Sequence, residues 1–281
     1  MYVPTVKSLG GNSVMKIGFI GCSDITKAIM RCIIEKNIVD KNDIYATNKD
    51  KYELHKVKES LGINTVNLRR EIAENCDIII LAERAEYYTE VACQIRDYLK
   101  ERHIIVSTAP NMPIEGIAER FGHNVKIIRA KPNTPSIVGE SMTGICRNGH
   151  VTLREFNYVC DLMRSFGVVE EVPEELIDVV IAVSSSSPAY VFMFIEAMAD
   201  AASSDGMPRA QAYEFAAQAV LGSAKMILET GKHPGELKDM VCSPGGTTLE
   251  AVRVLESHGL RSSVFEAVKA CAAHCKKVVD K

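Results

Sequence analysis

Short apolar runs alternate with amphipathic stretches through the first half of the chain. The apolar runs are residues 16–20, 43–47, 77–81, 103–107 and 125–129. Stretches with helical spacing lie between them, at residues 25–36, 51–61, 86–100 and 113–121. Strands that alternate with helices are typical of βαβ units, and continuous apolar strands fit a parallel sheet covered on both faces. The alternation therefore predicts an α/β domain, which we place at residues 15–172.

From Glu174 onward the sequence has a helical pattern, interrupted by proline and glycine at a few turns. Residues 173–183 and 188–202 are apolar on most sides, so we expect them to be deeply buried, with a subunit interface as one way of burying them. The segment from Val191 to Ala202 is too apolar for a helix that faces solvent, which predicts a dimeric building block. We place an all-helical dimerisation domain at residues 173–281.

Charge and composition exclude several classes of partner. A net charge of −3 provides no basic field, so we expect no nucleic-acid partner. The densest apolar run, residues 77–82, is far too short to span a membrane, and we expect no membrane partner. Residues 1–14 lack the apolar core of a signal peptide, which predicts a cytoplasmic protein whose fold begins at Met15. The nine scattered cysteines suit reduced thiols, and we expect no metal site.

The segment after the first apolar run, GFIGCSDITKAI, occupies the position of a dinucleotide-binding loop. Such a loop has the pattern G-x-G-x-x-G/A between a strand and a helix. This chain supplies Gly21, Ser23 and Thr26, so only the glycine of the tight turn is intact. The position favours a Rossmann-like cofactor loop, and the alternative is a plain turn between strand and helix.

The residues after the second run indicate which cofactor the loop would serve. An NAD site usually has an acidic residue there, which binds the ribose hydroxyls. Here Thr47, Asn48 and Lys49 offer a hydroxyl, an amide and an ammonium group, which suit a 2′-phosphate. We therefore expect NADPH, with NADH as the second choice. The alternative is a polar loop with one surface lysine.

Asn133 and Thr134 lie between two prolines at the end of the last predicted strand. Ligands of α/β folds bind at the carboxyl ends of strands, so we assign Asn133 to the nicotinamide side of the cofactor site. The alternative is a rigid turn in which the asparagine bonds to nearby backbone. Residues 177–206 contain no Lys, Arg or His, which argues against the base that alcohol oxidation requires.

The segment SPGGTT, residues 243–248, precedes a helical pattern late in the chain. Thr247 and Glu250 have the spacing of a capping box, and the two glycines permit unusual backbone angles and close approach. Because a helix N-terminus favours an anion, a small carboxylate fits there, held by backbone N–H groups and by the Ser243 and Thr248 hydroxyls. A plain helix cap is the alternative interpretation.

Four segments together resemble the pyrroline-5-carboxylate reductase family. They are KPNTPSIVGE (131–140), SSSSPAYVFMFIEAMADA (184–201), GMPRAQA (206–212) and HPGELKDMVCSPGGTTLEAVRVLE (233–256). The likeness runs from about Lys16 to Lys276 with order and spacing kept. It implies a Rossmann-like domain and a helical domain that interlocks with a second subunit in a homodimer or larger homo-oligomer. It also implies an oxidoreductase that reduces the cyclic imine 1-pyrroline-5-carboxylate to L-proline, the last step of proline biosynthesis, with NAD(P)H.

The resemblance also implies the site residues. The cofactor contacts would be Ile20, Gly21, Cys22, Ser23, Asp24, Ile25, Thr47, Asn48, Lys49, Ala82, Glu83, Thr108, Ala109 and Pro110. The substrate contacts would be Ser243, Gly245, Gly246, Thr247 and Thr248. Thr248 takes the place of the hydroxyl nearest the imine, where it or an ordered water serves as proton source. A protonated imine accepts hydride directly, so such a site needs neither lysine nor histidine.

The chain departs from the family pattern mainly on the cofactor side. Serine replaces the second loop glycine at Ser23, Glu83-Arg84-Ala85 replaces Val-Lys-Pro, Ala109-Pro110-Asn111 replaces Ala-Ala-Gly, and Lys131 replaces methionine. A run of four serines, 184–187, stands where the family has Ser-Gly-Ser-Gly, whereas the substrate turn is intact. Two alternatives therefore stay open: a related reductase that acts on another imine, and a ligand-binding paralogue without catalysis.

Overall fold

The computed structural model of the protein describes residues 15–279, with side chains described as far as Cys275. The chain forms two compact units, of which the first runs to Ser185 and resumes at Ala272, and the second is Ser186–Cys271. The boundary predicted at residue 172 follows the last strand of the first unit and stays a prediction. The predicted extension before Met15 lies outside the described residues.

The first unit is built on an eight-stranded sheet with the order β3-β2-β1-β4-β5-β6-β7-β8. The strands are β1 Ile17–Ile20, β2 Ile44–Thr47, β3 Asn64–Thr65, β4 Ile78–Leu81, β5 Ile104–Ser107, β6 Lys126–Lys131, β7 Ser141–Arg147 and β8 Gly167–Glu171. The first six in chain order pair in parallel, and β7 runs antiparallel to β6. The predicted Rossmann-like α/β class is confirmed, and the five predicted apolar runs are strands β1, β2, β4, β5 and β6.

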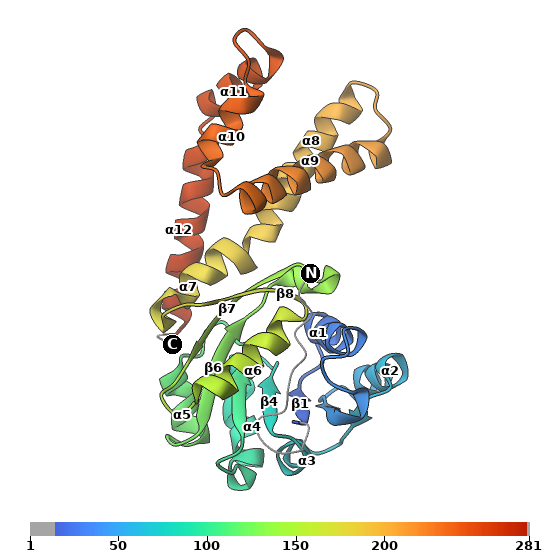
Figure 1. Cartoon of the computed structure of the whole chain (residues 1–281), viewed down its shortest axis with the longest axis vertical. Coiled ribbons are helices and arrows are strands. Elements are labelled where there is room, and N and C mark those ends of the chain that lie inside the picture. Colours follow the sequence, from blue (N-terminus) through green and yellow to red (C-terminus); the bar gives the residue numbers. More distant parts are fainter. Residues whose placement is uncertain (1–14, 280–281) are drawn as a thin grey trace. The chain divides into compact units, whose positions relative to one another are not determined.

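Six helices cover the two faces of this sheet (Figure 1). They are α1 Asp24–Glu35, α2 Lys51–Leu61, α3 Arg69–Asn75, α4 Tyr88–Ile95, α5 Ile114–Phe121 and α6 Leu153–Arg164. Side chains alternate along a strand, so Ile78 and Ile80 pack in one core cluster with α1, α2 and α6. Ile79 and Leu81 point the other way, into a second cluster with α3, α4 and α5. Burial on both faces explains why these strands are continuous apolar runs.

The second unit is helical, as predicted. A short helix, α7 Ile177–Val180, and a π-helical turn at Ile181–Ser185 precede it. Its helices are α8 Ser187–Ser204, α9 Arg209–Thr230, α10 Pro234–Val241, α11 Thr247–Ser257 and the first part of α12 Leu260–Val279 (Figure 1).

The expected deep burial of residues 188–202 does not occur within the single chain. Phe192 is 63% exposed and Met193 69% exposed, and among the α8 side chains only Ala199 is buried. In residues 173–183, Ile177, Ile181 and Ala182 are buried, whereas the side chains of Leu176, Val179 and Val183 face solvent. The reason is that α8 is apolar on most sides, whereas its packing against α9 covers only one of these sides.

The residues around α8 also correct the expectation about apolar run length. Residues 174–204 form a helical stretch that is long enough to span a membrane and contains an 18-residue window with a mean hydropathy of 1.6. The sequence estimate missed this because it counted uninterrupted apolar residues, whereas Asp178, Glu196 and the serines interrupt a segment that is apolar on average. Helices of soluble proteins that pack in a core or an interface have the same composition.

Candidate functional site

The turn between β1 and α1 has the geometry of a dinucleotide loop. Gly21 has φ +105°, and a Cβ there would lie 2.9 Å from the backbone of Ala82, so only glycine fits. Its N–H donates to the Thr47 carbonyl at 2.9 Å, which ties the loop to the end of β2. The turn therefore brings the N-terminus of α1, with its unpaired N–H groups, to the carboxyl edge of the sheet.

Ser23 has a role that the sequence did not reveal. It is the N-cap of α1, where its hydroxyl accepts from the Thr26 N–H at 3.3 Å and lies 2.8 Å from the Thr26 hydroxyl. Serine is a preferred N-cap, so the residue in the second glycine position stabilises the helix start. The same bond uses one N–H group of the first turn that would otherwise face an anion.

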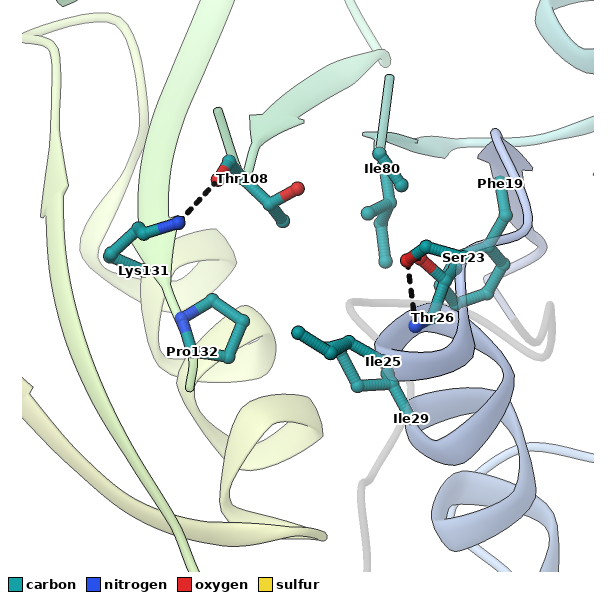
Figure 2. A pocket seen from close by; sticks show the side chains of 10 residues that line it. Phe19, Ser23, Ile25, Thr26, Ile29, Ile80, Thr108, Lys131 and Pro132 are labelled. Carbon is teal, nitrogen blue, oxygen red and sulfur yellow. Dashed lines mark hydrogen bonds between the residues drawn. The ribbon is translucent and has the colours of Figure 1, made fainter. Parts of the chain in front are cut away.

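A cavity of about 80 Å³ lies at the carboxyl edge of the sheet beside this loop (Figure 2). Four predicted cofactor contacts line it together: Ser23, Ile25, Ala82 and Thr108. They come from the ends of β1, β4 and β5, where the strand order reverses. In doubly wound folds this reversal is the point at which a dinucleotide binds.

Lys131 lines the same cavity from the end of β6 (Figure 2). Its ammonium group donates to the Thr108 carbonyl at 3.4 Å, a long bond for a cation. Burial lowers the pKa of Lys131 below its ordinary value. The departure from methionine thus places a poorly paired cation in the crevice.

The residues after β2 are already engaged with the protein. Thr47 is buried, and the Asn48 side-chain amide donates to the Asp50 carbonyl at 3.3 Å. The Lys49 ammonium pairs with Glu90 at 2.7 Å and lies 3.9 Å from the centre of the Tyr87 ring. Lys49 therefore stands at the end of β2, where a 2′-phosphate would bind, but it already has an anionic partner.

Arg69 joins this group, and sequence reasoning missed it. Its guanidinium contacts Glu90 at 2.8 Å and Glu83 at 3.4 Å. Hydrogen bonds from Lys49 and then from Arg69 hold the pKa of Glu90 below its ordinary value. Arg69 begins α3, the helix that follows β3, and β3 is a two-residue strand without an apolar run. The arginine could therefore not be placed without the fold. Glu83, a predicted cofactor contact, is paired with Arg69.

Several predicted cofactor contacts are internal. Ile20, Cys22 and Ala109 are buried, so they shape the site rather than offer side-chain groups to it. Burial raises the pKa of the Cys22 thiol to about 12, which removes it as a nucleophile. Two other predicted contacts also bond within the chain: Asp24 pairs with Lys27 in the first turn of α1, and the Pro110 carbonyl accepts from Arg129. All of these contacts stay predictions.

Asn133 connects three segments of the first unit. Its side-chain oxygen accepts from the Ser141 hydroxyl at 3.1 Å and from the Met142 N–H at 3.0 Å. Its amide group donates to the Ser184 carbonyl at 2.9 Å and to the Ser184 hydroxyl at 3.3 Å. The asparagine thereby fixes the end of β6 to β7 and to the π-helical turn. Its predicted contact with nicotinamide stays a prediction, and it would have to compete with these four bonds.

The segment SPGGTT forms a tight turn before α11, within the second unit. The Gly246 N–H donates to the Ser243 carbonyl at 3.0 Å. Gly245 has φ +71°, a conformation that favours glycine. A Cβ on Gly246 would lie 2.9 Å from the Ser243 hydroxyl. The backbone of Gly245 therefore favours glycine, and a side chain on Gly246 would displace the Ser243 hydroxyl.

The predicted capping box at Thr247 and Glu250 is wrong. Gly246 is the N-cap of α11 and makes no side-chain cap, Thr247 is the first helical residue, and Glu250 bonds to Arg253 at 2.9 Å. The extended backbone of Gly246 takes the cap position because the turn bends one residue before Thr247. A glycine cap leaves the first N–H groups of α11 available, which strengthens the interpretation of this end as an anion site. Thr248 lies in the same first turn.

Among the described residues, no group of three or more His, Cys, Asp or Glu side chains could hold a metal ion. The two candidate sites offer helix N-termini, hydroxyl groups and the cations Lys49, Arg69 and Lys131.

Two family models match the chain. Residues 174–278 match the family described as pyrroline-5-carboxylate reductase dimerisation. Residues 16–111 match the family described as NADP oxidoreductase, coenzyme F420-dependent. The first match includes the apolar stretch 174–204, so the composition that suits a membrane span belongs here to a dimerisation domain.

Relatives and solved structures match over nearly the full length. A pyrroline-5-carboxylate reductase of Escherichia coli is 48% identical over 263 residues, which cover 94% of this chain and 98% of the relative. The structure of a pyrroline-5-carboxylate reductase from Coxiella burnetii has a TM-score of 0.87 and 34% identity, with 94% of this chain and 98% of that chain covered. A pyrroline carboxylate reductase from Plasmodium falciparum, solved with NADP bound, has a TM-score of 0.86 and 29% identity over the same shares of both chains.

Proposed function

The chain belongs to the pyrroline-5-carboxylate reductase family, and we propose that it reduces 1-pyrroline-5-carboxylate to L-proline with NADPH. The observation that carries this proposal is the glycine-capped start of α11, because it offers a preorganised anion site to the substrate carboxylate. The first unit supports the cofactor assignment through the glycine turn of β1 and α1 and the cavity beside it.

The residues of the first unit fit a dinucleotide. Gly21 allows the close packing of the loop on Ala82, and the N-terminus of α1 suits a diphosphate. Lys49 and Arg69 at the ends of β2 and β3 provide the cations that a 2′-phosphate requires. The cofactor, when bound, supplies the hydride that the imine carbon accepts. We propose NADPH rather than NADH because two cations flank this position.

The residues of the second unit would bind and orient the imine. The first N–H groups of α11, together with the Ser243 hydroxyl, hold the carboxylate. Thr248 donates a hydrogen bond to the ring nitrogen and is the proton source there as the neighbouring carbon gains hydride, and the threonine regains its proton from solvent. No base is needed, because reduction consumes a proton rather than releasing one. Turnover would then depend on the orientation that the turn 243–246 imposes.

We also propose that the protein acts as a homodimer or larger homo-oligomer in the cytoplasm. The match of residues 174–278 to a dimerisation domain supports self-association. The exposed apolar face of α8, with Phe192 and Met193, supports it independently.

A specific observation favours the non-catalytic alternative. Glu83 and Lys131 place charges on the cofactor side at positions that are apolar in the family pattern, and Glu90 occupies the two candidate phosphate ligands. A protein that binds the cofactor weakly would still have the carboxylate site at the N-terminus of α11, and would then bind its ligand without reducing it.

The decisive experiment is NADPH oxidation by the purified protein, with 1-pyrroline-5-carboxylate and with its six-membered homologue as substrates. We expect oxidation with the five-membered imine and slower oxidation with the six-membered one. Faster reduction of the six-membered imine would support the related reductase. Binding of both ligands without oxidation would support the paralogue that has lost catalysis.

A further inference from the structure

We propose that the cofactor's 2′-phosphate binds to Lys49 and Arg69 by displacing the Glu90 carboxylate, so that Glu90 sets how strongly the protein prefers NADPH over NADH. The inference rests on the proposed function, since it assumes that the Rossmann-like unit binds a nicotinamide cofactor. It assigns to Arg69 and Glu90 roles that neither the sequence pattern nor the resemblance suggested.

Glu90 bridges the two cations with both of its oxygens. Oε2 lies 2.7 Å from the Lys49 ammonium, and Oε1 lies 2.8 Å from the Arg69 guanidinium. Each distance is that of a strong charge-assisted hydrogen bond. A phosphate oxyanion makes the same kind of bonds to the same donors, so the carboxylate occupies a site built for a bridging anion.

The cluster formed by Lys49, Arg69, Glu83 and Glu90 lies where the adenosine ribose of a dinucleotide binds in Rossmann folds. Lys49 follows β2, and Arg69 begins the helix after β3. Because β2 and β3 pair in parallel, both residues lie at the carboxyl edge of the sheet. This edge, next to the glycine turn of β1, is where Rossmann folds distinguish a ribose hydroxyl from a 2′-phosphate.

The cluster has a fixed part and a movable part. The Arg69 side chain is 8% exposed and is held from the other side by Glu83, which is 13% exposed. Glu90 and Lys49 are 45% and 46% exposed, so the Glu90 side chain can rotate into solvent. The Tyr87 ring, 3.9 Å from the Lys49 ammonium, keeps that cation in place when Glu90 leaves.

The charges explain why displacement would control cofactor choice. Lys49, Arg69, Glu83 and Glu90 sum to zero, so the resting cluster does not attract an anion. With Glu90 turned away, one net positive charge faces the phosphate. NADH has no group that needs this exchange, so only NADPH must break the two Glu90 ion pairs. The pair with Lys49 is exposed and therefore weak, whereas the pair with Arg69 joins an exposed carboxylate to a buried guanidinium group. Breaking both lowers NADPH affinity by about fivefold.

The test is isothermal titration of the full chain with NADPH, NADH, adenosine 2′,5′-bisphosphate and adenosine 5′-monophosphate. Glu90→Gln keeps the shape of the side chain and removes its charge. Glu86→Gln is the matched control, because Glu86 lies on the same segment and pairs with Arg84 at 3.1 Å. We expect Glu90→Gln to tighten NADPH and the bisphosphate about fivefold and to leave NADH and the monophosphate unchanged. Glu86→Gln should change none of the four affinities.

Unchanged or weaker NADPH binding by Glu90→Gln would overturn the inference, as would an equal gain for NADH. If the unaltered protein still reduces the imine, either result contradicts only this inference and leaves the proposed function standing. Failure of the unaltered protein to bind NADPH contradicts both the inference and the proposed function.

Discussion

At the scale of single residues, two of the departures on the cofactor side, Ser23 and Lys131, change the cofactor crevice itself. The sequence identified both as departures but could not say what they contact. Ser23 became interpretable only when its hydroxyl was found on the Thr26 N–H, and Lys131 only when it was found in the cavity beside Thr108. Contacts of this kind depend on distances across the sheet, which a residue pattern does not contain.

Ser23→Gly should bind NADPH more tightly than the unaltered protein. The change removes a Cβ from the loop and frees the Thr26 N–H, which Ser23 now occupies at 3.3 Å. Glycine is itself a tolerated N-cap, so the substitution should lower the free energy of unfolding by only about 0.3 kcal/mol. Titration with NADPH and thermal unfolding measure the two effects. No gain in affinity would contradict the prediction and mean either that the loop tolerates the serine side chain or that its hydroxyl donates to the phosphate.

Lys131→Met should raise the free energy of unfolding near neutral pH by about 1 kcal/mol, because it removes a buried and poorly paired ammonium group. Burial lowers the pKa of Lys131, so the unfolded chain binds this proton more readily than the folded chain. The penalty is therefore present at neutral pH and fades as the pH rises to the ordinary lysine value of 10.5. Denaturant unfolding across this range tests the sign, and a gain that grew with pH would contradict it.

At the scale of elements, the sequence identified those with a strong local pattern. Strands β1, β4 and β5 are short, mainly apolar runs that are buried throughout, and β2 and β6 are buried over most of their length. Strands β7 and β8 were not predicted, because Gly144 interrupts the apolar residues of β7 and two glutamates end those of β8. The start of α11 was placed one residue too late, because a glycine cap has no side chain to mark it.

Gly246→Val should abolish binding of the imine. Its side chain would meet the Ser243 hydroxyl at 2.9 Å and cover the N-terminus of α11. The control is Gly222→Ala on α9, where an added Cβ has no atom within 4 Å. Cofactor affinity, measured by titration, reports that the first unit is intact in both variants. Normal imine kinetics in Gly246→Val would mean that the turn is only a helix cap.

At the scale of the whole molecule, the sequence separated a sheet-forming half from a helical half and predicted deep burial of residues 188–202, with a subunit interface as one way of burying them. The apolar face of α8 is visible in the sequence, whereas its exposure in a single chain depends on which helices pack on it. The candidate site residues stay predictions. The charges beside the cofactor loop could not be predicted, because Arg69 and Glu90 approach Lys49 only in the folded chain.

The exposed apolar side chains of the second unit predict self-association. Phe192, Met193, Phe215 and Leu228 are each more than half exposed, and such a surface is unfavourable in water. Light scattering during size-exclusion chromatography at micromolar concentration should give at least twice the chain mass of 30.9 kDa. A monomer at that concentration would contradict the prediction.

The most direct test of the central claim is the steady-state rate of NADPH oxidation with 1-pyrroline-5-carboxylate, for the unaltered protein and for Thr248→Ala. We expect the unaltered protein to reduce the imine, and Thr248→Ala to lower kcat by up to roughly 10²-fold, the size of effect of one positioned proton donor. NADPH affinity should be equal in the two proteins. Equal turnover by both would remove Thr248 from the mechanism. If the unaltered protein binds NADPH but leaves it unoxidised, the account of the protein as a reductase is wrong.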